Sequence, residues 1–480
     1  MPLTDVHCIA IGKTRRHSIK IDVLPDYVFL RIFDFCFLGR YTFNWWHPLV
    51  HVCRRWRQLI FASPRRLNVQ LHCRGTTPVR EKLHYWPILP LAIAGAVPSD
   101  PIEQDNFVAA FEHRDRVRTV FCGLTTLQIE TLATMMQGPF PALTSFQLGN
   151  FYAPGHQGVP VLPDRFLDGS ASSLQEITLN GVYLPTLPTL LLSASNLVDL
   201  HLYDMSATMI SPEAMVTGLA AAKRLKDLIL EFHLPNARHE IIVTPPTRAV
   251  LPSLTGFQFL GEFEYLEDLV ARMDCPRLKF IKVSFSFQPV HISVPHFLQF
   301  IDRAEDLKLA PFRCADANFG QREVYFNLDS SRMPEPHSHL TIHFSCYLYP
   351  QIQSIKPFLE QLSAMFSTIY HLSVSLFEDV PLLPDMGDLG SLDLFRRFSA
   401  VETLHVGGRF VRLVDHILDD LVGTNIDTEV MPALRVLYLD GQRPSRSVRR
   451  FIATRKKSGY PVTVVDTREE LKKFEALEDG

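Results

Sequence analysis

A short pattern of apolar residues recurs along most of the chain. An apolar residue is followed by two other positions, a second apolar residue, one other position and a third apolar residue. Ten clear copies begin at Val117, Leu143, Leu174, Leu197, Leu225, Leu254, Leu278, Ile369, Val401 and Leu434. Weaker copies lie at Ala304/Leu307/Leu309 and around Leu340/Ile342. Most starts are roughly 23 to 33 residues apart, so the pattern predicts short, half-buried strands in repeating units.

Helix signals lie between these predicted strands. Ser211-Pro212-Glu213 combines a capping residue, a first-turn proline and an acidic residue, and it opens SPEAMVTGLAAAKR. The other helical segments are EYLEDLVARM, HFLQFIDRA, IKPFLEQLSAMF and RLVDHILDDLV. Strands that alternate with helices at this period predict an α/β fold, a solenoid of parallel strands, in which each unit covers the apolar flank of its neighbour. The stretch from Pro311 to His339 is interpreted as an insertion.

An enzyme built on β/α units is the alternative fold hypothesis. It predicts a convergent polar pocket at the carboxyl ends of the strands. The number of units and the shortness of the strand motif favour a solenoid over a closed barrel.

Two amphipathic helices are predicted near the start of the chain. In the first, Pro25 suits the first helical turn. Its apolar residues follow at helical spacing: Leu24, Val28, Ile32 and Phe35. The second is predicted to begin at Pro48, with apolar residues Leu49, Val52, Cys53, Trp56 and Ile60 and an opposite face rich in arginine. So many large apolar side chains in about forty residues cannot all be buried internally, so some are expected to face a partner.

The junction between these helices and the repeats contains further predicted elements. Strand-like pieces lie at 67–73 and 89–94, and a helix is expected at 102–113. We interpret the junction as a rigid N-terminal cap of the solenoid. The predicted organisation is a tail (1–20), a helical motif (21–64), a junction and cap (65–116), a solenoid (117–466) and a second tail (467–480).

The N-terminal helical segment resembles the F-box family. The matching residues, in order, are Leu24-Pro25, Ile32-Phe33, Val52-Cys53-Arg54-Arg55-Trp56-Arg57, Leu59 and Ser63-Pro64. The resemblance implies a three-helix motif that binds the Skp-type adaptor of a Skp/cullin/F-box ubiquitin ligase. Carried over by position, the implied adaptor contacts are Leu24, Pro25, Val28, Ile32, Val52, Cys53 and Trp56. Residues 37–47 depart from the family pattern, because they are more aromatic than its usual polar connection.

The repeats more loosely resemble leucine-rich repeats. That family has Asn or Cys three positions after the third apolar residue, where this chain has Phe151, Val182, Met205 and His233. In a parallel solenoid, the residue between the second and third apolar positions points away from the helices, to the strand-lined side. The predicted target contacts are therefore Gln147, Thr178, His201, Ile229, Gln258, Lys282, Ser373, His405 and Tyr438.

Together the two resemblances imply a non-catalytic, substrate-recognition subunit of a ubiquitin ligase, which holds a protein target for ubiquitination. The alternative is a leucine-rich-repeat scaffold that acts independently of any ligase.

Composition narrows the candidate chemistry. The formal net charge is −3, so there is no basic excess of the kind that binds nucleic acid. Eight scattered cysteines without a CxxC pair indicate reduced thiols and no zinc site. The longest apolar run, Ile88 to Val97, contains Pro90 and is too short to span a membrane.

Gly12-Lys13-Thr14 lacks the earlier glycine of a phosphate-binding loop, since position 7 is His7. We expect no catalytic residue, cofactor, metal, nucleic acid or membrane partner, and a location in the cytoplasm, the nucleus or both.

One basic segment, Arg443 to Lys457, has two interpretations. It is either a nuclear-import signal or patch for an acidic partner, or the polar face of a last helix. In the second interpretation the helix ends in a turn at Gly459-Tyr460-Pro461, followed by a strand from Val462 to Val465.

Overall fold

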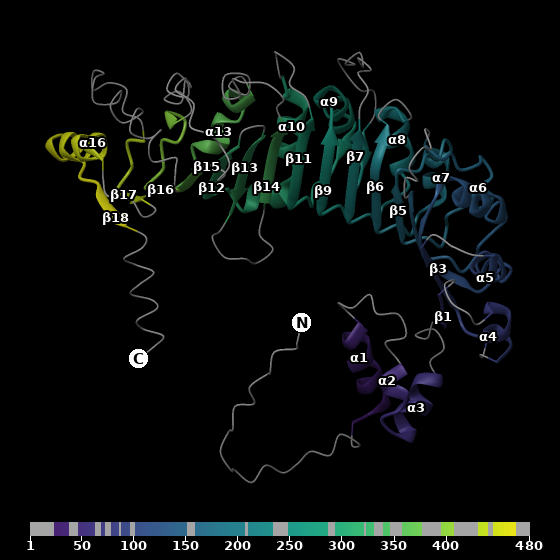
Figure 1. Ribbon diagram of the computed structural model, residues 1–480. Coiled ribbons are helices and arrows are strands. Elements are labelled where there is room, and N and C mark those ends of the chain that lie inside the picture. Colours follow the sequence, from purple (N-terminus) through teal and green to yellow (C-terminus); the bar gives the residue numbers. More distant parts are fainter. Residues whose placement is uncertain are drawn as a thin grey trace, which may run out of the picture.

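The repeated apolar residues form the strands of one long sheet (Figure 1). The computed structural model describes residues 24–37, 47–62, 69–72, 78–85, 88–96, 101–150, 159–206, 210–233, 248–286, 293–320, 323–330, 339–345, 358–376, 395–407, 431–439 and 445–466. The fold is mixed α/β with a mostly parallel sheet, as predicted. The sheet is open, with β1 and β18 at its edges.

The sheet has sixteen strands. In spatial order they are β1 Val69–His72, β2 Leu91–Ala96, β3 Val117–Leu124, β4 Ser145–Asn150, β5 Glu176–Asn180, β6 Asp199–Ser206, β7 Asp227–His233, β9 Gly256–Gly261, β11 Phe280–Ser286, β14 His339–Ser345, β13 Glu323–Asp329, β12 Cys314–Phe319, β15 His371–Leu376, β16 Thr403–Val406, β17 Val436–Leu439 and β18 Thr463–Asp466. Two short strands, β8 Ala249–Val250 and β10 Met273–Asp274, pair separately. All ten clear copies of the apolar pattern coincide with strands of the large sheet, so these predictions are confirmed.

The unit at β6 illustrates why the pattern gives a strand. Leu197, Leu200 and Leu202 are completely buried. Leu197 lies just before the strand, in a turn where its N–H donates to the carbonyl of Ala194 at 3.1 Å. Leu200 and Leu202 point to the same side of the strand because side chains alternate along it. The spacing of the pattern thus combines one turn position with two positions on the buried face.

The helices cover one face of the sheet and line the outer side of the arch in Figure 1. Their bounds are α4 Val79–Tyr85, α5 Pro101–Phe111, α6 Thr126–Met135, α7 Leu187–Ser193, α8 Pro212–Leu219, α9 Phe263–Ala271, α10 Pro295–Arg303, α11 Glu305–Leu309, α13 Ser363–Phe366 and α16 Arg446–Lys457, with a 3-10 helix at Phe166–Gly169. The predicted helices at α8, α9, α10 and α13 are confirmed, and RLVDHILDDLV lies outside the described residues. In α8, the Ser211 side chain accepts a hydrogen bond from the N–H of Ala214, as its capping signal predicts.

Strands β12, β13 and β14 interrupt the regular order. Strand β14 pairs parallel to β11, β13 pairs antiparallel to both of its neighbours, and β12 pairs parallel to β15. The chain therefore places three strands between β11 and β15 in reverse order. The predicted insertion, Pro311 to His339, joins the sheet as part of this meander, and the weak copy at Leu340/Ile342 forms β14.

The weak copy at Ala304/Leu307/Leu309 is not a strand. Leu307 and Leu309 lie in helix α11, and Ala304 lies between α10 and α11. Ala304 and Leu307 are buried, whereas Leu309 is exposed. A spacing of three residues places two side chains on one face of a helix as readily as it fits the strand motif, so the prediction of a repeat here was wrong.

The predicted cap belongs to the same sheet as the repeats. Strands β1 and β2 pair parallel to each other, and β2 pairs parallel to β3. Helix α5 confirms the predicted helix, while α4 was not predicted. The Asn106 side chain of α5 accepts a hydrogen bond from the N–H of Val79, the first residue of α4, at 2.7 Å. This buried contact fixes the two helices to each other.

A buried carboxyl on α9 contacts the first turn of α10. Glu267 accepts hydrogen bonds from the N–H groups of His296 and Phe297, in the first turn of α10, at 2.9 and 2.8 Å. Burial raises its pKa to about 7. Because this pKa is higher than in the unfolded chain, the folded state holds the proton more tightly.

We therefore expect the contribution of Glu267 to the free energy of unfolding to decrease as pH rises from about 4.5 to 7, by about 1–3 kcal/mol. Urea denaturation at pH 5 and pH 8 measures this change. The variant Glu267→Gln cannot titrate and should show a smaller decrease over the same interval. Equal decreases in the two proteins would contradict the prediction.

Candidate protein-binding surfaces

Three short helices precede the sheet. They are α1 Asp26–Phe37, α2 His47–Val50 and α3 Arg54–Phe61, and we call them the N-terminal module. Phe29 and Phe33 of α1 are buried, and the Trp56 ring of α3 lies edge-on to both, with centroid distances of 5.6 and 5.0 Å. Edge-to-face ring pairs are favourable beyond the area they bury. An aromatic cluster therefore packs α1 against α3.

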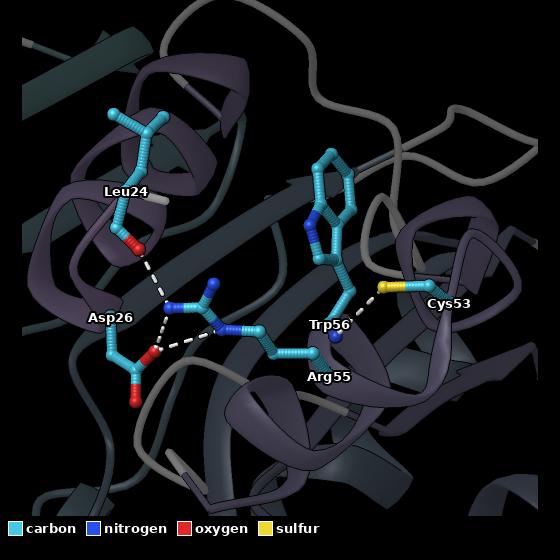
Figure 2. Close-up of polar contacts among 5 residues, drawn as sticks. All are labelled: Leu24, Asp26, Cys53, Arg55 and Trp56. Atoms are coloured by element: carbon cyan, nitrogen blue, oxygen red, sulfur yellow. Dashed lines mark hydrogen bonds and ion pairs between the residues drawn. The ribbon is translucent and has the colours of Figure 1, made fainter. Parts of the chain in front are cut away.

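Polar contacts of Arg55 join α3 to the start of α1 (Figure 2). The Arg55 guanidinium donates to the carbonyl of Leu24 at 2.6 Å and forms an ion pair with Asp26 at 2.6 Å. It also lies over the Phe29 ring, 4.9 Å from the centroid. These contacts fix the entry of the chain into α1.

The second predicted helix is divided into two. Helix α2 ends at Val50 and α3 begins at Arg54, so the single helix predicted from Pro48 to Ile60 was wrong in this respect. The reason lies at Cys53, whose backbone is extended (φ −156°, ψ 172°). Its Sγ atom accepts a hydrogen bond from the N–H of Trp56 at 3.4 Å, which is the role of a helix-capping residue (Figure 2).

Four large apolar side chains of the module remain exposed. Tyr27 and Ile32 on α1 are 70% and 37% exposed, Val52 between α2 and α3 is 58% exposed, and Phe61 at the end of α3 is 47% exposed. The module buries Phe29 and Phe33 but leaves these four apolar side chains partly accessible to solvent. Exposed apolar side chains gathered on one small module are typical of a surface that another protein covers.

The seven implied adaptor contacts all lie in this module. Ile32, Val52 and Pro25 are exposed, whereas the other four are partly buried: Leu24, Val28, Cys53 and Trp56. Leu24 and Trp56 pack against the apolar core. The matching residues Ser63 and Pro64 lie outside the described residues, as do residues 38–46 of the aromatic connection. The family pattern did not single out Tyr27 and Phe61, because both are apolar residues outside its matching positions.

The nine predicted target contacts lie in one row that crosses the sheet. Each aligns in register with a residue of the same row on the neighbouring strand, for example Gln147 with Thr178 and His405 with Tyr438. The row runs along the face of the sheet opposite the helices, which we call the open face. Ile229 is buried within the row, while the other eight are more accessible. Row members on further strands were missed, among them Phe121, Thr341, Asn327 and Asp316.

Three carboxylates lie side by side on the open face of β5, β6 and β7. Glu176, Asp199 and Asp227 are aligned in register on adjacent strands. His201 forms an ion pair with Asp227 at 3.1 Å, and this hydrogen bond raises the pKa of His201. Burial raises the pKa of Asp199; His201 opposes this rise, and the neighbouring carboxylates add to it by smaller amounts. This part of the open face is therefore electronegative.

Flat rings line the open face nearer to the C-terminus. His405 of β16 stacks on Tyr438 of β17 with a centroid distance of 4.1 Å. In the meander, His343 stacks on Tyr325 at 4.0 Å. Stacked pairs on neighbouring strands give this part of the open face rigid, amphipathic contact area. Such side chains suit the recognition of a protein surface.

The described residues contain no cluster of three or more His, Cys, Asp or Glu side chains that could hold a metal ion. Among the helices of the described ranges, none has the length and apolar character needed to cross a membrane. Comparisons of the sequence with models of known protein families and with curated proteins found no match.

Proposed function

We propose that this chain is the substrate-recognition subunit of a Skp/cullin/F-box ubiquitin ligase. In this proposal, the N-terminal module is an F-box that binds the Skp-type adaptor, and the sheet and its helices are an irregular leucine-rich-repeat domain that binds a protein target. The observation that carries the proposal is the exposure of Ile32 and Val52, two apolar residues that the family resemblance assigns to the adaptor.

The internal packing of the module supports this assignment. Phe29, Phe33 and Trp56 form the core, and Arg55 fixes the start of α1. Val52, 58% exposed, and the exposed part of Ile32, 37% of the side chain, are therefore presented on a packed framework. An apolar side chain on a rigid framework loses little conformational entropy on binding, so it contributes efficiently to affinity.

The open face supports the second half of the proposal. Its row of side chains extends from Phe121 on β3 to Tyr438 on β17 without a helix of the described residues covering it. A row of this length matches the extended binding surfaces of solenoid proteins. The target would contact aromatic, histidine and carboxylate side chains there.

Substitution of the exposed apolar residues tests the proposal. The double variant Ile32→Asp/Val52→Asp should bind a purified Skp-type adaptor at least about tenfold more weakly than the wild type, because two apolar contacts are lost and two charges are buried. Titration calorimetry measures the affinity. A matched control, Leu127→Asp/Leu309→Asp, makes the same change at two exposed leucines on α6 and α11.

The control variant should bind the adaptor with wild-type affinity. If the wild-type chain forms no complex with the adaptor, the ligase assignment fails, and the alternative of a scaffold independent of any ligase takes its place. Equal weakening by the two double variants would contradict the assignment of the docking surface to the N-terminal module.

A further inference from the structure

Helix α16 is firmly anchored at the C-terminal end of the sheet. Its apolar face buries Val448 and Phe451. The guanidinium of Arg455, also buried, donates to the carbonyls of Pro432 at 3.0 Å and Leu434 at 3.2 Å. The predicted last helix and the strand that follows it, β18, are thus confirmed.

The outward face of α16 carries five exposed cations. They are Arg446, Arg449, Arg450, Lys456 and Lys457, and we call them the cationic stripe. With 3.6 residues per turn, all five lie on the side opposite the buried residues, along about 16 Å of helix. The anchoring of α16 holds these charges in a fixed arrangement.

The N-terminal half of the cationic stripe is unfavourable for the helix itself. Helix α16 contains no acidic residue. Arg446 and Arg450 are four positions apart, a spacing at which like charges destabilise a helix. Arg446 and Arg449 also lie near the helix N-terminus, where the macrodipole disfavours cations. Within the described residues, none of the five forms an ion pair. Lys456 and Lys457 lie in the last turn, where the macrodipole favours cations. Helix stability therefore accounts for these two cations but not for Arg446, Arg449 and Arg450.

We propose that the cationic stripe binds an acidic segment of a partner protein. Guanidinium groups pair with carboxylates in a planar, two-bonded geometry, and three of the five cations are arginines. This proposal is independent of the ligase assignment, since α16 lies at the opposite end of the sheet from the N-terminal module (Figure 1).

Other anionic partners fit the surface less well. The chain as a whole has a net charge of −3, and the open face carries Glu176, Asp199 and Asp227, so its field disfavours a long polyanion such as nucleic acid. The exposed face of α16 carries no large apolar side chain of the kind that inserts into a membrane. A short acidic peptide would contact the stripe alone. It would therefore lie away from the carboxylates of the open face, and it needs no apolar side chain on α16.

The test uses the full chain and a fluorescein-labelled peptide of about ten Asp and Glu residues, long enough to follow the stripe. Fluorescence anisotropy at low and moderate salt measures its affinity. Neutralising three cations in the variant Arg449→Gln/Arg450→Gln/Lys456→Gln should weaken binding about tenfold. The control Arg80→Gln/Lys279→Gln/Lys308→Gln removes the same charge from cations already paired with carboxylates, and it should bind like the wild type.

Binding that weakens with salt and is lost only in the stripe variant supports the proposal. Absence of binding at low salt, or equal weakening in both variants, overturns it. Tighter binding of a single-stranded RNA of equal charge overturns it in favour of nucleic acid. A final variant, Glu469→Gln/Glu470→Gln/Glu475→Gln, tests whether acidic residues of the chain itself compete with the peptide for the stripe. Peptide binding about tenfold tighter than in the wild type would show that they do, and would overturn the proposal of a partner protein.

Discussion

Replacement of Trp56 by alanine is expected to destabilise the N-terminal module by about 2–3 kcal/mol, because the ring is largely but not fully buried. The indole ring contacts Phe29 and Phe33 edge-on, and its removal leaves a cavity between α1 and α3. A module of three short helices has little other core with which to compensate. Amide hydrogen exchange followed by mass spectrometry should show faster exchange in α1 and α3, with the strands of the sheet unchanged.

The variant Trp56→Phe provides the matched control. It keeps an aromatic ring between Phe29 and Phe33, so exchange in α1 and α3 should rise much less than in the alanine variant. Wild-type protection of both helices in Trp56→Ala would contradict the prediction. The comparison also separates two causes of weak adaptor binding, because Ile32→Asp/Val52→Asp changes exposed side chains and should leave the protection of the module intact.

The strands of the sheet were predictable because their pattern is both local and repeated. Leu200 and Leu202 lie on the buried face of β6, and Leu197 is buried in the turn before it. Stacked units repeat the same environment, so each copy supports the interpretation of the others. The same logic placed the row from Gln147 to Tyr438 on one face, since residues between two inward positions must point outward.

The meander of β12, β13 and β14 could not be predicted in this way. Its strands alternate buried and more accessible residues, as in Cys314–Phe319, but alternation does not determine which strand pairs with which. The neighbour of β11 is β14, which begins 53 residues after β11 ends. Pairing over that separation depends on tertiary packing. The row members Thr341, Asn327 and Asp316 were missed for this reason.

The N-terminal module shows a different limit. Helix α1 is apolar on nearly all sides, and the predicted stripe of Leu24, Val28 and Ile32 is only partly buried, while Phe29 and Phe33 form the core. Helical periodicity cannot select an inward stripe when two neighbouring stripes are both apolar. The family pattern, which marks positions rather than hydrophobicity, pointed to the exposed residues Ile32 and Val52.

A buried ion pair at the C-terminal end of α9 leads to the second prediction of large effect. The Nε atom of Arg272 lies 2.9 Å from Oδ1 of Asp268, four residues earlier, and both side chains are almost fully buried. The Nη2 atom of Arg272 has no hydrogen-bond partner among the described residues. Removal of Asp268 would leave the guanidinium buried without a counter-charge. We expect Asp268→Ala to lower the free energy of unfolding by about 3–5 kcal/mol.

The double variant Asp268→Leu/Arg272→Met should be as stable as the wild type or more stable, because it replaces two buried charges with apolar side chains of similar volume. Urea denaturation followed by circular dichroism measures both variants, together with Arg272→Met alone. A loss of less than about 1 kcal/mol in Asp268→Ala would show that the guanidinium can reach water when its partner is absent. We expect both single variants to be destabilised and the double variant to be stable. This result would show that each charge needs its partner once it is buried, but that folding does not need the ion pair itself.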